Sequence, residues 1–473
     1  MGSRAQFGGG GIVSAAASDR TGTGGPRVVV VGGGLAGLAA AVACADGGAR
    51  VTLFEARPRL GGATFSFRRE GLWVDNGQHV FLRCCTAYRR FLSRIGADGL
   101  TVLQDRMSIP VRSPDRTGWL RRSGLPAPLH LAGSLARYPF LGPIDRARTV
   151  RAAMAMSRLD PDDPDLDRRT FGAWLAEHGQ SAAAIESLWN LIALPTLNLD
   201  AGQASLALAA KVFRTGLLSQ PDAADVGYAR VPLSKVHAQP AARALGAAGA
   251  TVRLHMPVRR IAPVEGDRFD VMAEDGGERA DAVVVALPHD RVSEVLPSGA
   301  LPDPAAPARL GLSPIVNVHV VYDRRVMDLP FVAGVGSPVQ WVFDRTRPSG
   351  LEHGQYLAIS LSGADQEIEE RSETLRERFL PALEALFPDA RRAHVERFFV
   401  TREHSATFRQ TPGTRALRPG PVTGIPGLYL AGAWTDTGWP ATMEGAVRSG
   451  VAAATQALAR LGHARTVPEA VPA

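Results

Sequence analysis

Three glycines and one glutamate near the start of the chain have the spacing of a nucleotide-binding site. The glycines are Gly32, Gly34 and Gly37, and the acid is Glu55, 18 residues beyond the last glycine (55 − 37 = 18). In such a pattern the first glycine permits a tight turn, and the second lets a pyrophosphate approach the backbone. The third allows a helix to pack closely on a strand, and the acid accepts hydrogen bonds from a ribose. We therefore expect a dinucleotide to bind here.

The elements that would position these residues can be recognised on both sides of the glycines. Residues 28–31 are four valines, which is typical of a strand buried on both faces. An alanine-rich helical pattern starts at Leu35 and Ala36, and a second predicted strand, 51–54, ends just before Glu55. Strand, glycine pattern, helix, strand and acid in this order predict a Rossmann-type unit rather than an ordinary glycine-rich turn.

The residues after Glu55 indicate which dinucleotide is bound. Ala56 begins the stretch ARPRLGGA, which contains a second glycine pair, Gly61 and Gly62, followed by Ala63. This stretch resembles the flavin enzymes of the amine oxidase and carotenoid desaturase superfamily, in which the loop runs along the pyrophosphate of FAD. Many members have arginine where this chain has Ala63, so one phosphate contact must come from elsewhere. The resemblance also implies that the backbone of Val258 holds the adenine.

The stretch 427–446 near the C-terminus is the second strong signal. A predicted strand delivers Gly432 to the cofactor, and a helix is expected to start near Thr442 and Met443. The N–H groups at such a helix start stabilise the negative charge that a reduced flavin carries near N1. Asp436 lies in this stretch, and His79 lies in a segment, 75–79, that the superfamily places near the flavin.

Length and composition favour a two-domain globular protein. The chain has 473 residues, of which 45% are hydrophobic and 21% charged, and no apolar run approaches the ~18 residues of a membrane span. We expect an α/β fold in which a Rossmann-type FAD-binding domain is interleaved with an α+β substrate domain. The predicted ranges are 27–105, 230–300 and 418–462 for the FAD-binding domain, 106–229 and 301–417 for the substrate domain, and 1–26 for a disordered extension.

Secondary structure is predicted from periodicity and punctuation. Apolar stripes indicate helices at 87–95, 170–194, 205–218, 232–245 and 364–386. Runs rich in β-branched residues indicate strands at 251–255, 257–261, 269–273, 282–288, 315–322, 339–343, 356–361 and 394–400. The predicted strands between 251 and 288 belong to the FAD-binding domain, and those between 315 and 400 form the sheet of the substrate domain.

Positive charge is concentrated in the segment 106–158. The net charge of the chain is +7, and this segment alone holds ten arginines against Asp115 and Asp145, a balance of 10 − 2 = +8. Leucines and aromatic residues are interleaved with these arginines, which suits a surface lying on an anionic bilayer. No recognition helix or stacking motif accompanies them, so nucleic acid is not expected as a partner. A solvated face over a helix of the substrate domain is an equally weighted alternative.

Cysteine and acid usage argue against disulfides and metals. Cys44, Cys84 and Cys85 are an odd set without zinc-type spacing, which fits buried thiols in a reducing cytoplasm. The acidic segment 160–167 has two prolines and lacks the glycine and terminal glutamate of a calcium loop, so it is predicted to be a turn. We expect no metal site.

Four stretches together resemble the squalene-associated FAD-dependent desaturase group, over about residues 27 to 460: GGGLAGLAAA, EARPRLGGATFSF, DNGQHVFLRCCTAY and AGAWTDTGWPATMEGAVRSG. This group includes the hydroxysqualene dehydroxylases of bacterial hopanoid synthesis. The resemblance implies a long-chain C30 isoprenoid substrate, reductive removal of its hydroxyl, an apolar tunnel and peripheral contact with the inner membrane from the cytoplasm. Other squalene-pathway enzymes are candidate partners.

The proton donor is not determined by the sequence. His79 and Asp436 are the candidates, because both lie in segments expected near the flavin. For Asp436 a role in binding the flavin ribityl chain or in orienting its loop competes with acid catalysis. A packed, hydrogen-bonded histidine is the corresponding structural alternative for His79, and a water activated by backbone groups is a third donor.

Three rival functions share this architecture. A carotenoid-type desaturase would take hydride from a squalene- or phytoene-like chain, and the sequence does not reveal the direction of hydride flow. An amine oxidase would need an aromatic cage and often a lysine-held water, whereas this chain has 6% aromatics and two lysines, Lys211 and Lys235. A non-enzymatic prenyl-lipid escort related to GDP-dissociation inhibitors has no need of the intact glycine pair. Oligomeric state and the reductant for FAD are not indicated.

Overall fold

The computed structural model describes residues 25–463, so the predicted extension 1–26 lies outside the described residues except for its last two positions. The glycine pattern is placed by a five-stranded parallel sheet in the order β10-β2-β1-β14-β20. Its strands are β10 (Thr251–Arg253), β2 (Arg50–Phe54), β1 (Arg27–Val31), β14 (Ala282–Val285) and β20 (Leu428–Leu430). Parallel pairing brings Val30 opposite Leu53 on one side and Val284 on the other. The predicted Rossmann-type sheet is therefore confirmed.

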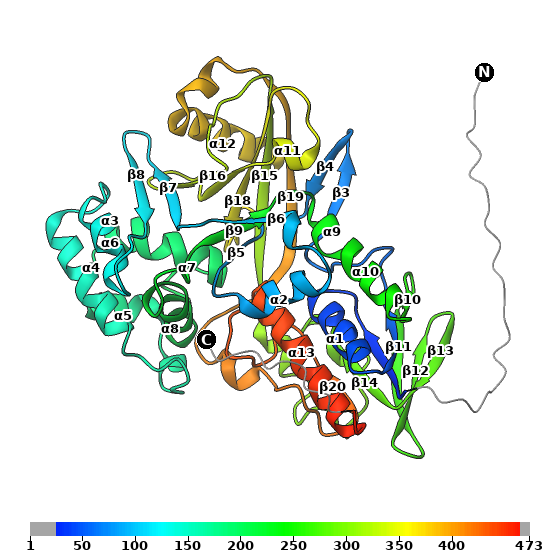
Figure 1. Ribbon diagram of the computed structural model, residues 1–473. Helices are drawn as coiled ribbons and strands as arrows, with labels where there is room; N and C mark the ends of the chain where they lie inside the picture. The colour runs from blue at the N-terminus through cyan, green and yellow to red at the C-terminus, as the bar shows by residue number, and fades with distance from the viewer. Residues whose placement is uncertain (1–24, 464–473) are drawn as a thin grey trace, which may run out of the picture.

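Both faces of this sheet are covered, which explains the unbroken valine run of β1. Val28 and Val30 pack with helices α1 (Leu35–Asp46) and α13 (Met443–Arg460) on one face. Val29 and Val31 pack on the other face against an antiparallel sheet of β11 (Val258–Val264), β12 (Arg268–Ala273) and β13 (Gly276–Ala280). A strand buried on both faces has no position that favours a polar residue. In Figure 1 this assembly occupies the lower right of the molecule.

A second, seven-stranded sheet lies above the first in Figure 1. Its order is β19-β15-β18-β17-β16-β7-β8, with only the β16–β7 pair parallel. The strands are β19 (Val395–Phe408), β15 (Leu312–Tyr322), β18 (Gln355–Ser362), β17 (Trp341–Asp344), β16 (Phe331–Gly334), β7 (Ser108–Arg112) and β8 (Thr117–Arg121). Helix α12 (Ser372–Leu386) covers one part of it through Leu375, Phe379 and Leu383.

A layer of helices covers the β7–β8 end of this sheet and forms the left side of Figure 1. Its core contains Tyr138, Phe171, Trp174 and Trp189, all of them buried. The layer consists of α3 (Ala132–Ala136), α4 (Pro143–Met156), α5 (Phe171–Glu177), α6 (Ala182–Ala184), α7 (Asn190–Leu197), α8 (Leu206–Phe213) and two π-helical turns, Ile185–Trp189 and Arg214–Leu218. No helix within residues 25–463 combines the length and the hydropathy that crossing a bilayer requires.

The remaining elements connect these layers. Two small sheets join β3 (Ser66–Arg69) to β4 (Leu72–Asp75), and β5 (Val80–Leu82) to β9 (Val226–Ala229) and β6 (Thr101–Leu103). The other helices are α2 (Thr86–Arg94), α9 (Leu233–Val236), α10 (Ala238–Ala247), α11 (Thr346–Ser349) and the 3-10 turns Asp98–Leu100, Leu129–Leu131, Leu166–Arg168, Val292–Glu294, Pro307–Leu310, Pro388–Arg392 and Thr414–Leu417. The parallel sheet draws its strands from the ranges predicted for the FAD-binding domain, and the seven-stranded sheet from those of the substrate domain. The domain boundaries themselves stay a prediction.

Three expectations about secondary structure were wrong. The helix expected over 364–386 begins only at Ser372, and the residues 365–370 before it form turns. The single helix expected over 170–194 is broken by a turn at Gly179, which has φ +66°, and the hydroxyls of Thr170 and Ser181 cap the starts of α5 and α6. The sequence of 106–158 predicts no strand, yet β7 and β8 form a hairpin that ends the seven-stranded sheet. In β7, Pro110 and Arg112 alternate with the buried residues Ile109 and Val111, so the sequence lacks the run of β-branched residues by which a strand is recognised.

Candidate functional site

The two glycine segments that the sequence analysis singled out face one another at close range. Gly61 donates its N–H to the Gly33 carbonyl at 2.8 Å. A Cβ placed on Gly62 would lie 2.8 Å from the Cα of Gly34, and Gly62 has φ +54°, which L side chains rarely adopt. Gly34 is also the N-cap of α1 and provides no side chain to cap the helix. The start of α1 and the second glycine pair therefore leave free helix N–H groups beside a cradle that any side chain would fill.

Glu55 is fixed at the carboxyl edge of the parallel sheet. It is 8% exposed, and its two carboxylate oxygens accept hydrogen bonds from the backbone N–H groups of Gly33 (2.7 Å) and Arg57 (2.7 Å). The Glu55 carbonyl accepts from Met256 N–H at 2.9 Å, which brings Val258 to the same corner of the sheet. Each carboxylate oxygen keeps a second lone pair for a ribose hydroxyl. Acid, glycine turn and helix start thus meet where a dinucleotide binds in such folds, and the residues present fit FAD.

Arg59 is a residue of this site that the sequence analysis missed. Its guanidinium lies 3.3 Å above the centroid of the Phe65 ring and donates from Nη1 to the Gly62 carbonyl at 3.2 Å. The side chain therefore runs along the second glycine pair, where Ala63 supplies no cation. Ala63 implies that one phosphate contact comes from another residue, and an arginine three residues before Gly62 is the signal in the sequence that points to it.

We expect Arg59→Gln to weaken FAD binding about tenfold, because a lost charge-assisted hydrogen bond costs about 1.5 kcal/mol. Titration of the apoprotein with FAD, followed by flavin fluorescence, measures the change. The matched control is Arg57→Gln, since Arg57 is exposed and contacts Glu55 only through its backbone. Equal FAD affinities for the two variants would contradict a role for the Arg59 side chain.

The segment 75–79 is held against the loop that follows the glycine pair. Asn76 donates from Nδ2 to the Ala63 carbonyl (2.7 Å) and accepts the Phe65 N–H at Oδ1 (3.1 Å). Asn317 on β15 donates to the Asn76 carbonyl at 3.1 Å, and its Oδ1 is buried without a partner among the described residues. A Cβ placed on Gly77 would lie 3.5 Å from His79 Nε2 and 3.8 Å from Asn317 Nδ2. His79, two residues away in the sequence, and Asn317 on β15 therefore both approach Gly77.

His79 is half-buried, and its surroundings set its protonation state. Burial lowers the pKa of His79 below its usual value, and Arg345 acts in the same direction, whereas the Asp75 carboxylate and the Ala63 carbonyl favour the protonated ring. The Arg345 guanidinium itself forms a buried ion pair with Asp75. The neutral form of His79 is thus favoured, with a carboxylate close enough to support the charged form.

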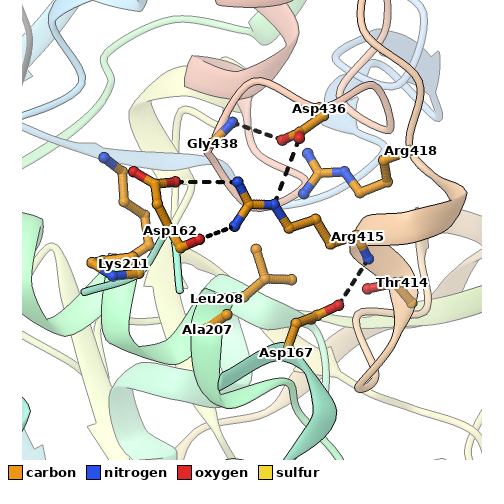
Figure 2. A pocket seen from close by; sticks show the side chains of 11 residues that line it. Asp162, Asp167, Ala207, Leu208, Lys211, Thr414, Arg415, Arg418, Asp436 and Gly438 are labelled. Carbon is orange, nitrogen blue, oxygen red and sulfur yellow. Dashed lines mark hydrogen bonds and ion pairs between the residues drawn. The ribbon is translucent and has the colours of Figure 1, made fainter. Parts of the chain in front are cut away.

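Asp436 lies in a different environment, at a small hollow between α8 and the C-terminal segment (Figure 2). Its carboxylate accepts the Gly438 N–H at 3.1 Å and is 3.8 Å from the Nε of Arg415. Arg415 also donates to the Asp162 carbonyl at 2.8 Å, so the acidic turn predicted at 160–167 packs against this segment. No hydrogen bond or ion pair joins Asp436 to His79 within residues 25–463. The structure therefore does not link the two residues, and a position near the flavin remains a prediction for each of them.

The C-terminal segment is shaped by a buried arginine that no local signal revealed. Arg418 donates to the carbonyls of Trp434 (3.1 Å), Thr435 (2.6 Å) and Trp439 (2.8 Å). Burial lowers its pKa to about 10, against the opposing attraction of Asp436. Thr442 follows as the N-cap of α13, its hydroxyl accepting the Gly445 N–H at 3.2 Å. The predicted start of this helix is confirmed.

Close packing joins this helix to the first glycine pattern. A Cβ placed on Gly450 of α13 would lie 2.1 Å from the Ala36 carbonyl of α1. Gly432, which has φ +149°, donates its N–H to the Ser449 hydroxyl at 2.8 Å. The middle of α13 therefore lies against the start of α1, where Leu35 and Ala36 are found, and Met443 at the start of α13 packs against the same hydrophobic core. Contact of these residues with the cofactor stays a prediction. Ala56 is exposed beside Glu55.

Known proteins are similar to this chain over most of its length. The model of the flavin-containing amine oxidoreductase family matches residues 35–458. The hydroxysqualene dehydroxylase of Rhodopseudomonas palustris is 31% identical over 435 residues, which cover 88% of this chain and 95% of that protein. The 15-cis-phytoene desaturase of Synechococcus elongatus is 23% identical and is covered to 92%, with 88% of this chain aligned.

The fold is also similar to solved structures. The structure of putrescine oxidase bound to putrescine superimposes with a TM-score of 0.70 and 21% identity, over 92% of this chain and 99% of the oxidase. At that identity the likeness concerns the fold. The predicted α/β fold class is confirmed.

Proposed function

Because the chain belongs to the flavin-containing amine oxidoreductase family, we propose that it acts within that family as a hydroxysqualene dehydroxylase. It is an FAD-dependent oxidoreductase, so the predicted cofactor and enzyme class are confirmed. The observation that carries the proposal is the alignment with a hydroxysqualene dehydroxylase over 95% of that protein at 31% identity. The lipid-escort alternative is set aside, since the FAD cradle is intact.

The reaction balances as a reductive dehydroxylation. The C–O bond of the C30 alcohol breaks, the oxygen takes one proton and leaves as water, and the carbon accepts a hydride to give squalene. Reduced FAD, when bound, supplies the hydride. The protein must hold the alcohol carbon against the flavin, deliver the proton and exclude bulk water, for which an apolar tunnel is part of the proposal.

We assign the proton delivery to His79 and an orienting role to Asp436. His79 borders the 63–65 loop that follows the second glycine pair, whereas Asp436 faces Arg415 and the turn of Gly438. The contacts of the Asp436 carboxylate with the Gly438 N–H and the Arg415 guanidinium join two parts of the C-terminal segment, which suits a role in positioning this loop.

The pH dependence of the reaction follows from the lowered pKa of His79. The protonated donor is present only below that pKa, so the rate should rise as pH falls and reach half its maximum below pH 6.5. Single-turnover reoxidation of the reduced enzyme at a series of pH values measures this. His79→Gln should lose about 100-fold in rate and the pH dependence with it, while Asp436→Asn keeps the pH profile. An unchanged profile in His79→Gln would assign the proton to another donor.

The function is tested by adding hydroxysqualene anaerobically to the chemically reduced enzyme. Reoxidation of the flavin together with appearance of squalene is expected, and a flavin that stays reduced would contradict the proposal. The second candidate is a desaturase, favoured by the alignment with a phytoene desaturase. The oxidised enzyme given squalene or phytoene would then become reduced. The proposal includes a cytoplasmic location, peripheral membrane contact and supply of substrate by other squalene-pathway enzymes.

A further inference from the structure

Exposed apolar side chains are concentrated on one part of the surface. Ten large hydrophobic residues are exposed among those described, and half of them lie within 125–154. These five are Leu125, Leu129, Ile144, Val150 and Met154, with exposed fractions between 45% and 69%. Hydrophobic residues scattered singly over a surface are normal, whereas a cluster indicates a contact with a partner or a membrane.

Arginines without partners stand among these apolar residues. On α4, the buried residues Thr149, Ala152 and Met156 define the inner side, and Ile144, Met154 and the exposed Arg148 and Arg151 lie on the outer side. Neither arginine forms a hydrogen bond or ion pair with another residue of the described chain. A helix face that mixes apolar residues with unpaired arginines suits the boundary between lipid headgroups and acyl chains, because arginine stems stay in apolar surroundings while their charges reach phosphates.

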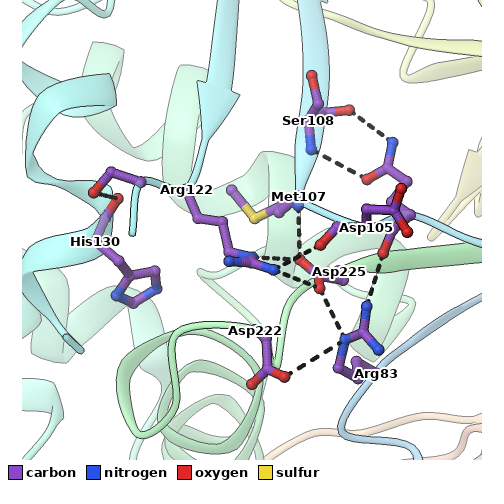
Figure 3. Close-up of polar contacts among 10 residues, drawn as sticks. Arg83, Asp105, Met107, Ser108, Arg122, His130, Asp222 and Asp225 are labelled. Carbon is purple, nitrogen blue, oxygen red and sulfur yellow. Dashed lines mark hydrogen bonds and ion pairs between the residues drawn. The ribbon is translucent and has the colours of Figure 1, made fainter. Parts of the chain in front are cut away.

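The leucine pair Leu125 and Leu129 is carried by a loop with a rigid base. Arg122 donates from Nε (2.6 Å) and Nη2 (3.0 Å) to the buried carboxylate of Asp225, as Figure 3 shows. One residue further on, Ser123 N–H donates to the His130 carbonyl at 2.7 Å, which closes the loop. The two leucines therefore project from a fixed frame, and ordering them on a partner costs little further conformational entropy.

We propose that the loop 122–131 and the outer side of α4 form a docking face for an anionic phospholipid bilayer. Both lie at the left edge of Figure 1, on the side of the molecule away from β10–β13. The local excess of positive charge is complementary to anionic headgroups, and the apolar residues supply the insertion that charge alone does not. Beneath this face lies the layer of helices whose buried core contains Tyr138, Phe171, Trp174 and Trp189. The docking face deepens the proposed function. It rests on that function in one respect, namely that the C30 alcohol proposed as the substrate dissolves in bilayers.

The docking face is tested by co-sedimentation of the full-length, FAD-loaded protein with vesicles. Vesicles of phosphatidylglycerol and phosphatidylcholine should bind the protein, and pure phosphatidylcholine should bind it much less. Leu125→Ser combined with Leu129→Ser should weaken the partition coefficient about tenfold, as expected from loss of two half-exposed leucines. Arg148→Gln combined with Arg151→Gln should weaken it about tenfold as well, and 0.5 M salt should remove this difference.

Val422→Ser combined with Met272→Ser is the matched control, since both residues are exposed apolar side chains outside the face. Equal vesicle binding by this control and the two face variants would overturn the proposal. So would variants that convert a dimer to a monomer, or that weaken binding to a single-stranded oligonucleotide, while vesicle binding stays unchanged. Flavin absorbance shows that each variant is folded.

The outcome is separable from that of the proposed function. Reoxidation by hydroxysqualene dispersed in detergent micelles does not need the bilayer, so the face variants should keep it within about twofold. A wild-type protein that binds anionic vesicles yet is not reoxidised contradicts only the dehydroxylase proposal. A wild-type protein that is reoxidised but does not bind anionic vesicles contradicts only the proposed docking face.

Discussion

Gly62→Ala is expected to purify without its flavin and to bind added FAD about 100-fold more weakly than the wild type. The new Cβ would lie 2.8 Å from Gly34 Cα at a residue with φ +54°. The left-handed backbone costs an L residue about 1–2 kcal/mol, and overpacking adds about 1–3 kcal/mol. The apoprotein can relieve this strain by moving the 61–64 loop away from α1, but FAD requires the two to approach again. Equilibrium titration with FAD measures the loss.

Gly71→Ala separates the backbone cost from the steric one. Gly71 also has a positive φ, +84°, but an added Cβ would meet nothing within 4 Å. This variant should lose about 1 kcal/mol of stability and keep its FAD affinity. A yellow Gly62→Ala protein with the affinity of Gly71→Ala would show that the two glycine segments do not form the pyrophosphate cradle.

Asp225→Asn is expected to lower the free energy of unfolding by about 3 kcal/mol, because removing one partner of a buried ion pair leaves the other charges uncompensated. The Asp225 side chain is fully buried and accepts hydrogen bonds from Arg122, from Arg83 Nε (2.8 Å) and from Met107 N–H (2.7 Å). The Asp225 carboxylate therefore links its own segment to three others at the base of the docking face (Figure 3). Urea unfolding followed by tryptophan fluorescence measures the loss.

Asp222→Asn provides the control for that measurement. Asp222 is half exposed and lies 3.7 Å from the same Arg83 Nε, so its loss should cost less than about 1 kcal/mol. Similar losses for the two variants would contradict a special role for the buried carboxylate.

The same carboxylate makes a prediction about pH. Burial would raise the pKa of Asp225, but the hydrogen bonds from Arg122, Arg83 and Met107 outweigh it and hold the pKa below its usual value. A lowered folded-state pKa contributes stability that is complete above the unfolded value of about 3.9 and is lost as pH falls through the folded value. The stability of Asp225→Asn should therefore depend less on pH below about pH 4 than that of the wild type.

Much of the cofactor site could be predicted because its signals are local. The turn at Gly32, the helix start at Gly34 and the acid Glu55 belong to one strand–helix–strand unit, and Gly62 lies in the loop that follows it. Each part of that unit demands a particular residue type: φ above zero demands glycine, close approach of two backbones excludes a Cβ, and a ribose demands an acceptor. Thr442 was recognisable for the same reason, since a helix start selects a capping residue.

The catalytic side could not be predicted to the same extent. His79 and Asp436 looked equivalent in sequence, and only packing gave one of them Ala63 and Asp75 as neighbours and the other Arg415. Asn317 reaches Asn76 across 241 positions of sequence, and no local rule pairs two such residues. The strands β7 and β8 were missed because β8 is an edge strand and β7 pairs with β16 only at Val111 and Arg112, so Pro110 lies outside that pairing. Strands of this kind tolerate the arginines and prolines that a fully paired central strand excludes.

The sequence by itself determined that this protein binds FAD in a Rossmann-type unit, since the constraints lie within some thirty residues and act through backbone geometry. The tertiary structure alone decided which charges are paired. It buries Asp225 between Arg83 and Arg122, turns Asp436 toward Arg415, and leaves Arg148 and Arg151 beside Ile144 on the outer side of α4. Ion pairing depends on distances between segments that folding brings together, and those distances are set by the packing of whole layers.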